Sequence, residues 1–536
     1  MEAAKAYRQA ASMMPHTNAG LLAAICLREA GEMDQAISAI EHYIVEHPND
    51  ADGWANLGKL RMDSKQFSDA VPALEKALSL TSNSHARDML NRALWNVSNQ
   101  DRHDDLDIEI SRLSKRTMVD MTDKPLKILF VHQNFPGQFL HLAPELALRG
   151  HDCRALTDER NRRESSIPTW RYKHDGQAVD PGSARLGRNY IIHSDRGVTV
   201  ARAALQLREN EGYVPDIIVG HSGWGETLFL KEVWPEAKLL VYAEFYYRGQ
   251  GADVGFDPEF NPPHFDQVMI SQGRAAYLGQ ALAHADRGLS PTEWQASTYP
   301  APLRSMIDVV FDGVDTEKLA PDPGASIALP NGRILKAGDE VLTFVNRNLE
   351  PYRGYHILMR ALPEVMAARP EAQIVIVGGN EVSYGAAPKQ GGTWKDIFLS
   401  EVRDRIDPSR VHFLGKVPYP SFVSLLHVSR VHAYLTYPFV LSWSAVEALA
   451  AGALVVGSRT RPVEEVIEHG KNGLLLDFFD VPGWSRQLIE CLAEPERFMP
   501  LREEARRRAV ASYDLNSVCL PRLVELVERM RMGPAT

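Results

Sequence analysis

Cysteine is scarce in this sequence. The 536 residues contain four cysteines, Cys26, Cys153, Cys491 and Cys519. Their wide spacing forms neither a disulfide framework nor a zinc-binding pattern. We therefore expect buried or idle thiols in a reducing compartment.

Long apolar runs are absent too. No stretch approaches the roughly 20 apolar residues that cross a membrane. The N-terminus also lacks the basic start and apolar centre of a signal peptide. Both absences favour a cytoplasmic protein. Peripheral membrane association stays open, because it needs only a surface patch.

Several enzyme signatures are missing. The sequence has no Walker loop, no His-x-x-Glu-His motif and no serine nucleophile elbow. Its one Asp-x-Asp motif, Asp105-Leu-Asp107, lies in a charged segment rather than after a strand, which disfavours a metal-dependent transferase of that type and predicts no metal site. A net charge of −10 argues against a general nucleic-acid binder.

The length and composition indicate a multidomain globular protein. A chain of 536 residues is too long for one hydrophobic core, and 44% hydrophobic with 24% charged residues is ordinary for a globular chain. We expect helical repeats over residues 1–100, a charged linker over 101–123, two α/β units over 124–320 and 321–510, and a C-terminal helix over 511–536.

The first part of the chain repeats itself. Ala24, Ala36 and Ile40 recur as Gly58, Ala70 and Leu74 after a period of 34 residues. This period, with small residues where two antiparallel helices would touch, resembles the tetratricopeptide repeat. Helices are also expected before Met14 and over His85–Val97.

A different pattern begins at Lys127. Lys127–Val131 is a continuous apolar run, followed by a turn at Phe135–Gly137 and an amphipathic helix over Phe139–Arg149, as in a parallel sheet. Further strands of this unit are expected at Asp216–Val219, Leu239–Ala243 and Arg287–Ser290, while Asp308–Phe311 is expected to begin the crossover to the next unit. Pro321–Gly338 is expected to form a hinge or hairpin. The strands expected in the second unit are Leu342–Val345, Gln373–Val377, Val411–Leu414, Val431–Leu435, Leu454–Gly457 and Gly473–Leu475.

The stretch Tyr437–Leu476 predicts a phosphate-binding site. It contains a helix that opens at Ser442–Ser444, a buried strand and a polar turn, Arg459–Glu464. The amide groups and positive end of such a helix attract phosphate, while the carboxylate of Glu447 suits ribose hydroxyls.

Two arginines follow the first strand of the second unit. Arg347 and Arg353 carry guanidinium groups that could clamp a diphosphate and offset leaving-group charge without a metal. The alternative for each is an ordinary surface charge. Their place after a buried strand, together with the Glu447 helix, favours the functional interpretation.

Other polar residues follow strands of the first unit. His221 could donate to a substrate hydroxyl or transfer a proton, or could be a capping or core histidine. Glu226 could contact substrate or be an ordinary residue of the next helix's first turn. Gly137, with Gln133 and Gln138 beside it, marks either a substrate contact or a plain turn. Glu244–Arg248 offers polar and aromatic groups to the same expected cleft.

From about Lys127 to the C-terminus the chain resembles glycosyltransferase family 4, the retaining "glycosyl transferases group 1" enzymes. The resemblance covers roughly three quarters of the chain and rests on the first strand with its Gly137 turn, His221, Arg347 with Arg353, and Glu447 with Gly452. It implies an α/β GT-B fold, in which two Rossmann-like domains face a cleft. Here they would be preceded by an all-α domain of tetratricopeptide-like repeats.

The resemblance also implies residue roles. Arg347 matches the family's phosphate-binding arginine, and Arg353 stands where a lysine is usual. The residues expected to be catalytic are His221, Arg347 and Arg353. The residues expected to bind the donor are Gly137, Gly415, Lys416, Val417, Ser442, Trp443, Ser444 and Glu447, with Glu447 at the ribose and Gly415–Val417 near the base. Gln138, Glu226 and Glu244 are candidates for the acceptor side. The C-terminal helix is expected to return to the N-terminal domain.

One position departs from the family. The signature has two glutamates eight positions apart, and Phe439 occupies the first position. That carboxylate usually faces the donor sugar, so Ser442, Ser444 or the amides of Val440–Trp443 would have to replace its hydrogen bonds.

The sequence therefore predicts transfer of a hexose from a UDP- or GDP-linked sugar to an acceptor hydroxyl, with retention and without a metal or other cofactor. Residues 1–100 are expected to recruit a protein acceptor or partner; a dimerisation or solubility module is the alternative. The rival function is a scaffold that binds a nucleotide without turning it over. Phe439 favours this rival, whereas Arg347, Arg353 and Glu447 oppose it.

Overall fold

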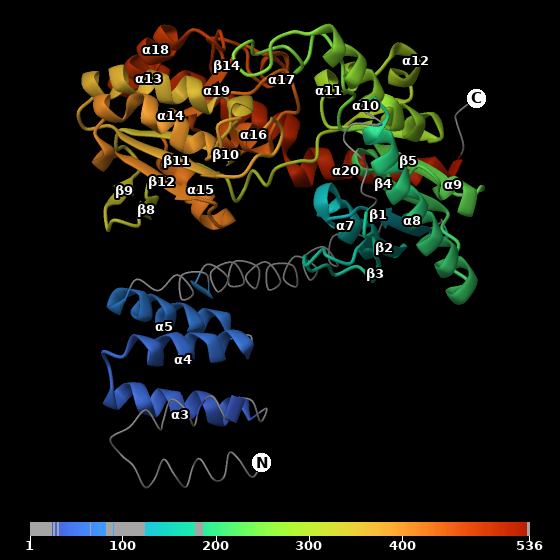
Figure 1. The fold of residues 1–536 in the computed structure, drawn as a ribbon, viewed down its shortest axis with the longest axis horizontal. Coiled ribbons are helices and arrows are strands. Elements are labelled where there is room, and N and C mark those ends of the chain that lie inside the picture. The colour runs from blue at the N-terminus through green and yellow to red at the C-terminus, as the bar shows by residue number, and fades with distance from the viewer. Residues whose placement is uncertain are drawn as a thin grey trace. The chain divides into compact units, whose positions relative to one another are not determined.

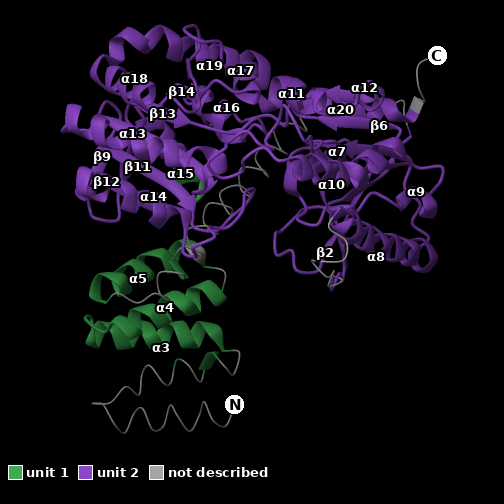
Figure 2. Ribbon diagram, turned by 45° about the horizontal axis from the view of Figure 1, so that its top comes forward, with its two compact units in different colours: residues 1–120, 418–422 green, residues 121–417, 423–536 purple. Residues whose placement is uncertain are grey.

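The computed structural model describes residues 32–64, 66–81, 124–176 and 186–532, together with residues 24, 27, 28, 89 and 90. The expected linker at 101–123 and most of the first and last helices expected in the repeat region lie outside these residues. The chain divides into two compact units, one containing the N-terminal helices and the other containing both large sheets (Figure 2).

The first unit contains α3 (Met33–Glu46), α4 (Ala51–Asp63) and α5 (Phe67–Leu80). The residues that recur with the 34-residue period are all buried: Ala24, Ala36, Ile40, Gly58, Ala70 and Leu74. A Cβ atom at Gly58 would lie 2.4 Å from Leu74 Cγ, so glycine allows α4 and α5 to pack closely. The recurring positions thus serve helix packing, and the tetratricopeptide assignment stays a prediction.

The first large sheet has seven parallel strands in the order β3-β2-β1-β4-β5-β6-β7 (Figure 1). The strands are β1 (Lys127–Val131), β2 (Asp152–Asp158), β3 (Thr169–Tyr172), β4 (Ile217–His221), β5 (Lys238–Tyr242), β6 (Arg287–Ser290) and β7 (Ile307–Val309). Its helices are α7 (Leu142–Leu148), α8 (Arg188–Glu211), α9 (Leu230–Val233), α10 (Phe265–Ala283), α11 (Glu293–Ser297) and α12 (Ala301–Arg304). We call this part the N-terminal α/β domain.

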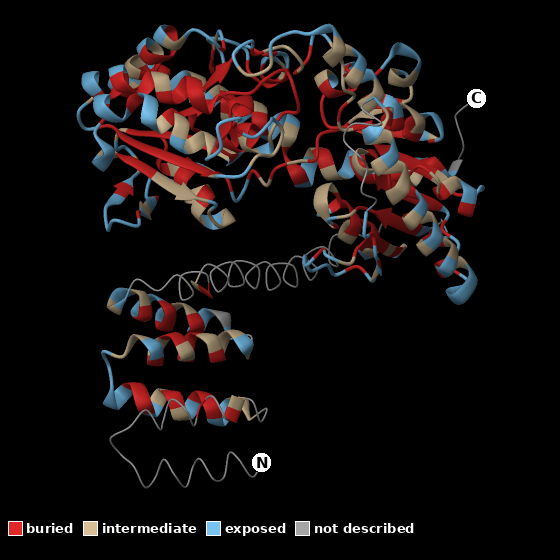
Figure 3. Cartoon of the chain, viewed as in Figure 1, coloured by how far each residue is buried: buried red, intermediate tan, exposed pale blue. Residues whose placement is uncertain are grey.

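Strand β1 shows why strands of this sheet are continuous apolar runs in the sequence. Ile128 and Phe130 enter one hydrophobic core, whereas Leu129 and Val131 enter the core on the opposite face. Both faces are therefore covered, as a parallel sheet requires, and every second residue serves one face. The buried strands are red in Figure 3.

The second large sheet, in the C-terminal α/β domain, has six parallel strands in the order β12-β11-β10-β13-β14-β15. The strands are β10 (Val341–Asn348), β11 (Gln373–Gly379), β12 (Val411–Gly415), β13 (Val431–Tyr434), β14 (Leu454–Ser458) and β15 (Leu474–Leu476). Its helices are α13 (Tyr355–Ala368), α14 (Trp394–Val402), α15 (Tyr419–Val428), α16 (Trp443–Ala450), α17 (Arg461–Val466), α18 (Val481–Ala493) and α19 (Met499–Tyr513). All six strands expected in this domain are confirmed.

The structure decides one expectation near the first sheet, overturns a second, and adds two strands that the sequence did not predict. Pro321–Gly338 forms the hairpin of β8 (Ser326–Ala328) and β9 (Ile334–Lys336), which decides between hinge and hairpin. The expected crossover at Asp308–Phe311 was wrong, because β7 is the last strand of the first sheet. Strands β2 and β3 were not expected, since polar and charged residues interrupt their apolar pattern.

The last described α-helix packs on the N-terminal α/β domain. Helix α20 (Leu520–Arg529) packs against α7, and its apolar residues Leu523, Val524 and Val527 join the core that also contains residues of β1.

Three of the four cysteines are described. Cys153, Cys491 and Cys519 are free and buried, while Cys26 is outside the described residues. Within the described part of the chain, no helix has the length and apolar character needed to span a membrane.

Both strand orders reverse direction at one point. In the first sheet β1 lies between β2 and β4, and in the second β10 lies between β11 and β13. Ligands of such sheets bind outside the carboxyl ends of the strands at this switch point. His221 ends β4 and Arg347 lies near the end of β10, so both stand at these positions.

Candidate functional site

Two histidines meet at the switch point of the N-terminal α/β domain. His221 ends β4 and His132 follows β1, and their ring centroids lie 5.4 Å apart. The Nδ1 atom of His221 accepts from the Gly223 amide at 2.9 Å, and that of His132 accepts from the Asn134 amide at 2.9 Å. Because an amide can only donate, each neutral ring carries its proton on Nε2.

Burial keeps both histidines neutral. It lowers the pKa of His132 to about 4 and lowers the pKa of His221 well below its usual value. His132 Nε2 donates to Gln138 Oε1 at 2.9 Å, whereas His221 Nε2 has no hydrogen-bond partner among the described residues. His221 Nε2 is therefore a buried donor that lacks an acceptor among the described residues, and it is unsuited to act as a base.

Glu244 lies beside this pair, just beyond the end of β5. Its Oε1 atom accepts from Gln138 Nε2 at 3.3 Å, and its Oε2 atom lies 3.8 Å from His221 Nε2. The side chain is 35% exposed. Removal from water and the nearby charge of Asp312 raise its pKa to about 7, although the charges of Arg353 and Arg347 act in the opposite direction. The structure thus brings Glu244 together with Gln138, His221 and both arginines.

Asp312 connects this group to the other domain. It accepts from Tyr242 Oη at 3.0 Å and from the indole Nε1 of Trp443, the first residue of α16, at 2.7 Å. Burial raises the pKa of Asp312 to about 6, and these two hydrogen bonds oppose the rise. The Trp443 side chain, expected to bind the donor, is thus engaged with the opposite domain.

Arg347 is an exposed cation near the end of β10. Its side chain is exposed, and within the described residues its guanidinium forms no hydrogen bond or ion pair. Desolvation and the positive charge of Arg347 both lower the pKa of Arg163, which follows β2 and donates to the Asn134 carbonyl at 3.1 Å. Two like charges near each other create a place where an anion is favoured.

Arg353 is buried rather than exposed. It ends a short turn before α13, is 4% exposed, and donates through Nη1 to Thr436 Oγ1 at 2.7 Å and to the Val440 carbonyl at 3.1 Å. Its guanidinium also lies over the Tyr384 ring, 4.9 Å from the centroid. Arg353 therefore supports the loop before α16 and brings its positive charge close to Glu244.

Helix α16 opens as expected. Ser442 is its N-cap, its hydroxyl accepts from the Ser444 amide at 3.4 Å, and the two hydroxyls are 2.9 Å apart. Glu447 lies in the second turn and is 9% exposed. An eight-residue helix with a serine cap presents partial positive charge at this end.

Phe439 takes part in an aromatic cluster that draws on both domains. Its ring centroid lies 4.6 Å from that of Phe245 in the N-terminal domain, 5.2 Å from Tyr352 and 5.3 Å from Tyr384. The side chain is 5% exposed. A carboxylate here would be surrounded by rings, so the residues around position 439 fit the phenylalanine rather than the family's glutamate.

Glu226 does not reach the site. It is fully buried, accepts from Tyr172 Oη at 2.5 Å and from the Gln133 amide at 2.9 Å, and burial raises its pKa to about 7. Both oxygens are satisfied, so the expected acceptor contact is replaced by a structural role.

Position 137 requires glycine for two reasons. Its backbone has φ +52°, and a Cβ atom there would lie 2.5 Å from the ring of His132.

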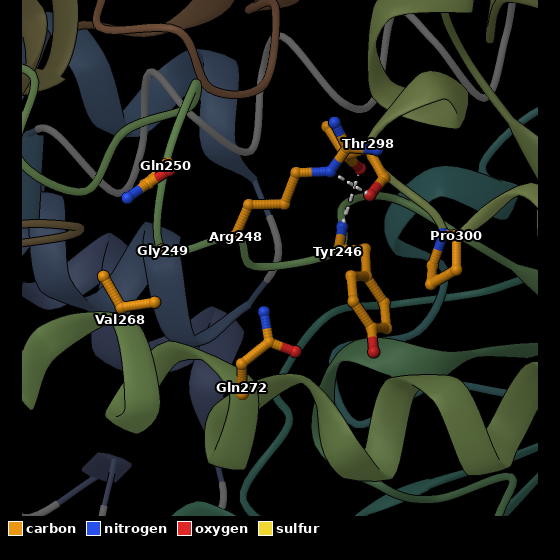
Figure 4. A pocket seen from close by; sticks show the side chains of 8 residues that line it. All are labelled: Tyr246, Arg248, Gly249, Gln250, Val268, Gln272, Thr298 and Pro300. Carbon is orange, nitrogen blue, oxygen red and sulfur yellow. Dashed lines mark hydrogen bonds between the residues drawn. The ribbon is translucent and has the colours of Figure 1, made fainter. Parts of the chain in front are cut away.

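The side chains of residues 244–248 do not all lie at the same place in the structure. Tyr246 and Arg248 line a different cavity of about 370 Å³ with Gln250 and Gln272 (Figure 4). Arg248 donates to the carbonyls of Thr298 and Ser297 at 2.6 and 2.5 Å. Tyr246 and Arg248 therefore lie away from the site described above, to which Glu244 belongs.

Gly415, Lys416 and Val417 follow β12 at the edge of the second sheet. Gly415 has φ +67°, which glycine adopts without strain. The ammonium of Lys416 pairs with Glu381 at 3.0 Å, and both side chains are mostly exposed. Nothing in the structure tests their place at a nucleotide base, which stays a prediction.

One cluster in the described residues has the geometry of metal ligands. Asp257, Glu259 and His356 have potential ligand atoms within 4.8 Å of one another. Arg360 binds both oxygens of Glu259 at 2.7 Å, and Asp257 accepts from Tyr437 Oη at 2.7 Å. Since these carboxylates already have protein partners, the cluster is explained as an ion-pair network.

The sequence did not identify three residues of this site: His132, Arg163 and Asp312. His132 could have been found, because it directly follows a buried strand as His221 does. Asp312 follows β7, the strand that was not expected.

Two family models match the chain. Residues 149–319 match the model described as "Glycosyl transferase family 4 group", and residues 331–509 match "Glycosyl transferases group 1". The matched stretches correspond to the domains of the first and second sheets. The expected resemblance is confirmed for these two domains.

Curated relatives match over part of their length. The D-inositol 3-phosphate glycosyltransferase of Corynebacterium urealyticum is 28% identical over 237 residues, which is 43% of this chain and 53% of the relative. That of Segniliparus rotundus is 26% identical over 298 residues, 52% of this chain and 61% of the relative. The chain thus spans little more than half the length of these relatives. A glycogen synthase of Mycobacterium tuberculosis is 22% identical over 422 residues, 73% of this chain and 92% of the relative.

Solved structures share the fold. Sucrose-phosphate synthase from Thermosynechococcus elongatus gives a TM-score of 0.57 at 17% identity, covering 76% of this chain and all of that chain. Anabaena HepE, solved in complex with UDP-glucose, gives 0.53 at 16% identity over 75% of this chain and all of that chain. At these identities the likeness shows the fold alone, and it confirms the expected GT-B arrangement of two Rossmann-like domains.

Proposed function

We propose that this chain, which carries a glycosyltransferase family 4 group domain and a group 1 domain, transfers a hexose from a nucleotide-diphosphate sugar to an acceptor hydroxyl with retention of configuration. The observation that carries the proposal is Arg347 at the switch point of the second sheet, an exposed guanidinium that forms no hydrogen bond or ion pair with the described residues. A diphosphate would supply its missing anion.

The donor diphosphate would lie between Arg347 and the N-terminus of α16. Guanidinium groups bind phosphate oxygens through paired, charge-assisted hydrogen bonds. The Ser442 cap and the positive end of the helix add to this attraction. Glu447 would accept from the ribose hydroxyls, and Gly415–Val417 would lie near the base.

The same groups would assist the departure of the nucleoside diphosphate. The arginine charges stabilise the negative charge that develops on the leaving phosphate, which supports a reaction without a metal. His221, neutral and protonated on Nε2, would donate to a sugar hydroxyl. Glu244 and Gln138 would contact the acceptor, and substrate phosphate and hydroxyl groups would assist proton transfer.

The relatives guide the choice of donors to test. HepE binds UDP-glucose in its solved structure, and the curated relatives are named as glycosyltransferases or a glycogen synthase. We therefore propose UDP- and GDP-linked hexoses as donors for this chain.

The test measures release of nucleoside diphosphate from a panel of UDP- and GDP-linked sugars, with and without acceptors. Arg347→Ala should reduce turnover of the preferred donor about 10- to 100-fold, because one charge-assisted contact of roughly 1.5–3 kcal/mol is lost. Glu447→Gln should weaken donor binding. Arg486→Ala on α18, an exposed arginine outside the site, should leave turnover unchanged. Full turnover by both Arg347→Ala and Glu447→Gln would refute the assignment.

Phe439 supports a second candidate function, a scaffold that binds the nucleotide without turnover. The aromatic cluster leaves no carboxylate at the position where the family has one. Saturable donor binding with no hydrolysis and no transfer in the same panel would favour this function.

For residues 1–100 we propose recruitment of a protein acceptor or partner. Buried small residues let the described helices pack closely, as arrays that present a binding surface to a peptide or protein do. Identical partners in pull-downs with and without residues 1–100 would refute this role.

A further inference from the structure

The loop before α16 forms hydrogen bonds with both α/β domains. We call residues 439–443 the donor loop. The N-terminal α/β domain holds every second residue: Trp294 Nε1 donates to the Phe439 carbonyl at 2.8 Å, the Leu441 amide donates to Gln295 Oε1 at 3.2 Å, and Trp443 donates to Asp312.

The loop's own domain holds the residues between these. Arg353 donates to the Val440 carbonyl at 3.1 Å, and the Ser442 amide donates to Tyr434 Oη at 2.9 Å. The two α/β domains thus hold successive residues of the loop in turn. Ser442 is extended, with φ −79° and ψ 143°.

Gln295 is the central residue on the N-terminal side. It lies in α11 and is 1% exposed. Its Oε1 atom accepts from Leu441, and its Nε2 atom donates to the Glu244 carbonyl at 2.9 Å. Since both partners are backbone groups with fixed roles, only one orientation of the carboxamide satisfies them. One side chain thus joins the donor loop to the backbone of Glu244.

Helix α11 is itself fixed to the C-terminal domain. Glu465 of α17 accepts from the amides of Glu293 and Trp294 at 2.8 and 2.7 Å. Thr292 caps the helix and accepts from the Gln295 amide at 3.1 Å. The carboxamide of Gln295 therefore projects from a short helix whose start is secured by two contacts.

We propose that Gln295 is a positioning residue, which sets the donor loop and Glu244 in the geometry that the reaction needs. This inference rests on the proposed function. Nothing in it requires Gln295 to touch substrate. When Gln295 is lost, the Leu441 amide and the Glu244 carbonyl each lose a buried partner, so both sides of the site loosen together.

The first measurement needs no substrate. In the full chain, Gln295→Ala should increase hydrogen–deuterium exchange in peptides covering residues 436–447, while peptides of β14 stay unchanged. Gln272→Ala, which removes an exposed carboxamide from α10, is the matched control and should change neither. Unchanged exchange over residues 436–447 in Gln295→Ala would overturn the proposal.

The second measurement uses Gln295→Glu. A protonated glutamic acid mimics glutamine, because its carbonyl accepts from Leu441 and its hydroxyl donates to the Glu244 carbonyl. An ionised carboxylate would instead repel that carbonyl. Burial favours the protonated form at low pH. With UDP or GDP as the probe, Gln295→Glu should bind roughly tenfold more weakly than wild type at pH 8 and within about twofold at pH 5.5, whereas Gln295→Ala should be weak at both.

Each comparison is made with wild type at the same pH, because four acids belong to the same bonded network: Glu244, whose carbonyl Gln295 binds, Asp312, which binds the donor loop through Trp443, and Glu293 with Glu465 at the start of α11. A pH-independent ratio for Gln295→Glu would overturn the positioning role. If the wild-type chain binds neither nucleotide, the proposed function fails, and the exchange measurement still decides whether Gln295 holds the loop.

Discussion

The variant Glu226→Gln tests whether Glu226 serves the fold of the N-terminal α/β domain or the binding of a ligand. Glu226 is fully buried, and burial raises its pKa from 4.5 to about 7. The folded state therefore binds the proton more tightly than the unfolded state. For a carboxyl with a raised pKa, the associated stability is present below about pH 4.5 and is lost as the pH rises through 7.

The shift of about 2.5 pKa units corresponds to roughly 3 kcal/mol, at about 1.36 kcal/mol per unit. The glutamine introduced by Glu226→Gln resembles the protonated acid, since its oxygen can accept from the Gln133 amide and its NH₂ group can donate to Tyr172 Oη. We expect Glu226→Gln to match wild type in free energy of unfolding at pH 4.5. By pH 8 it should exceed wild type by about 3 kcal/mol, because only wild type must then ionise a buried group.

Global hydrogen exchange of β1 and β4 amides, measured from pH 4.5 to 8, follows the opening of this domain without assuming two-state unfolding of the whole chain. Glu232→Gln, an exposed glutamate on α9, is the matched control and should show no such trend. Nucleotide binding by Glu226→Gln should stay within about twofold of wild type. A stability difference that does not change with pH, or a large loss of binding, would refute the structural role of Glu226.

Two further outcomes are expected. Because burial and the charge of Asp312 raise the pKa of Glu244 to about 7, wild-type transfer activity should rise between pH 6 and 8 as Glu244 loses its proton. Glu244→Gln should flatten this pH profile and lower kcat about a hundredfold, and a retained pH profile in that variant would exclude Glu244. Phe439→Glu, which restores the family's carboxylate, should lower the unfolding temperature and should not raise activity, since it places a charge among Phe245, Tyr352 and Tyr384. A more active, equally stable variant would show that the ring cluster is dispensable.

The sequence was sufficient where a polar residue directly follows an apolar strand. His221 and Arg347 were found in this way, and both lie at switch points. The pattern works because parallel strands are buried on both faces and end at one edge, where side chains first meet solvent. This sequence pattern predicts where along the chain a site residue lies, but it does not predict whether its side chain is exposed. Arg353 was therefore expected beside Arg347 at the diphosphate, although it is buried and supports the donor loop.

The sequence was insufficient where a role depends on a distant partner. Gln295 and Leu441 are 146 residues apart, and nothing in the short α11 segment marks its carboxamide. The structural role of Glu226 was missed for the same reason, because its partner Tyr172 lies 54 residues earlier on a strand that was not expected. Asp312 was missed with β7, whose three residues are too few to show a pattern.

At position 439, residues from two distant segments of the chain meet. The sequence shows that the glutamate is absent, and the structure shows what surrounds the phenylalanine. Phe245 packs on Phe439, and the residue before Phe245 is Glu244, whose carboxyl feels the charges of Arg347 and Arg353. An acidic group that feels the charges of both arginines thus comes from the N-terminal α/β domain, directly before a ring that packs on Phe439. A ring at 439 and an acid at 244 are therefore parts of one arrangement, which is why exchanging residue 439 alone should not restore the family's site.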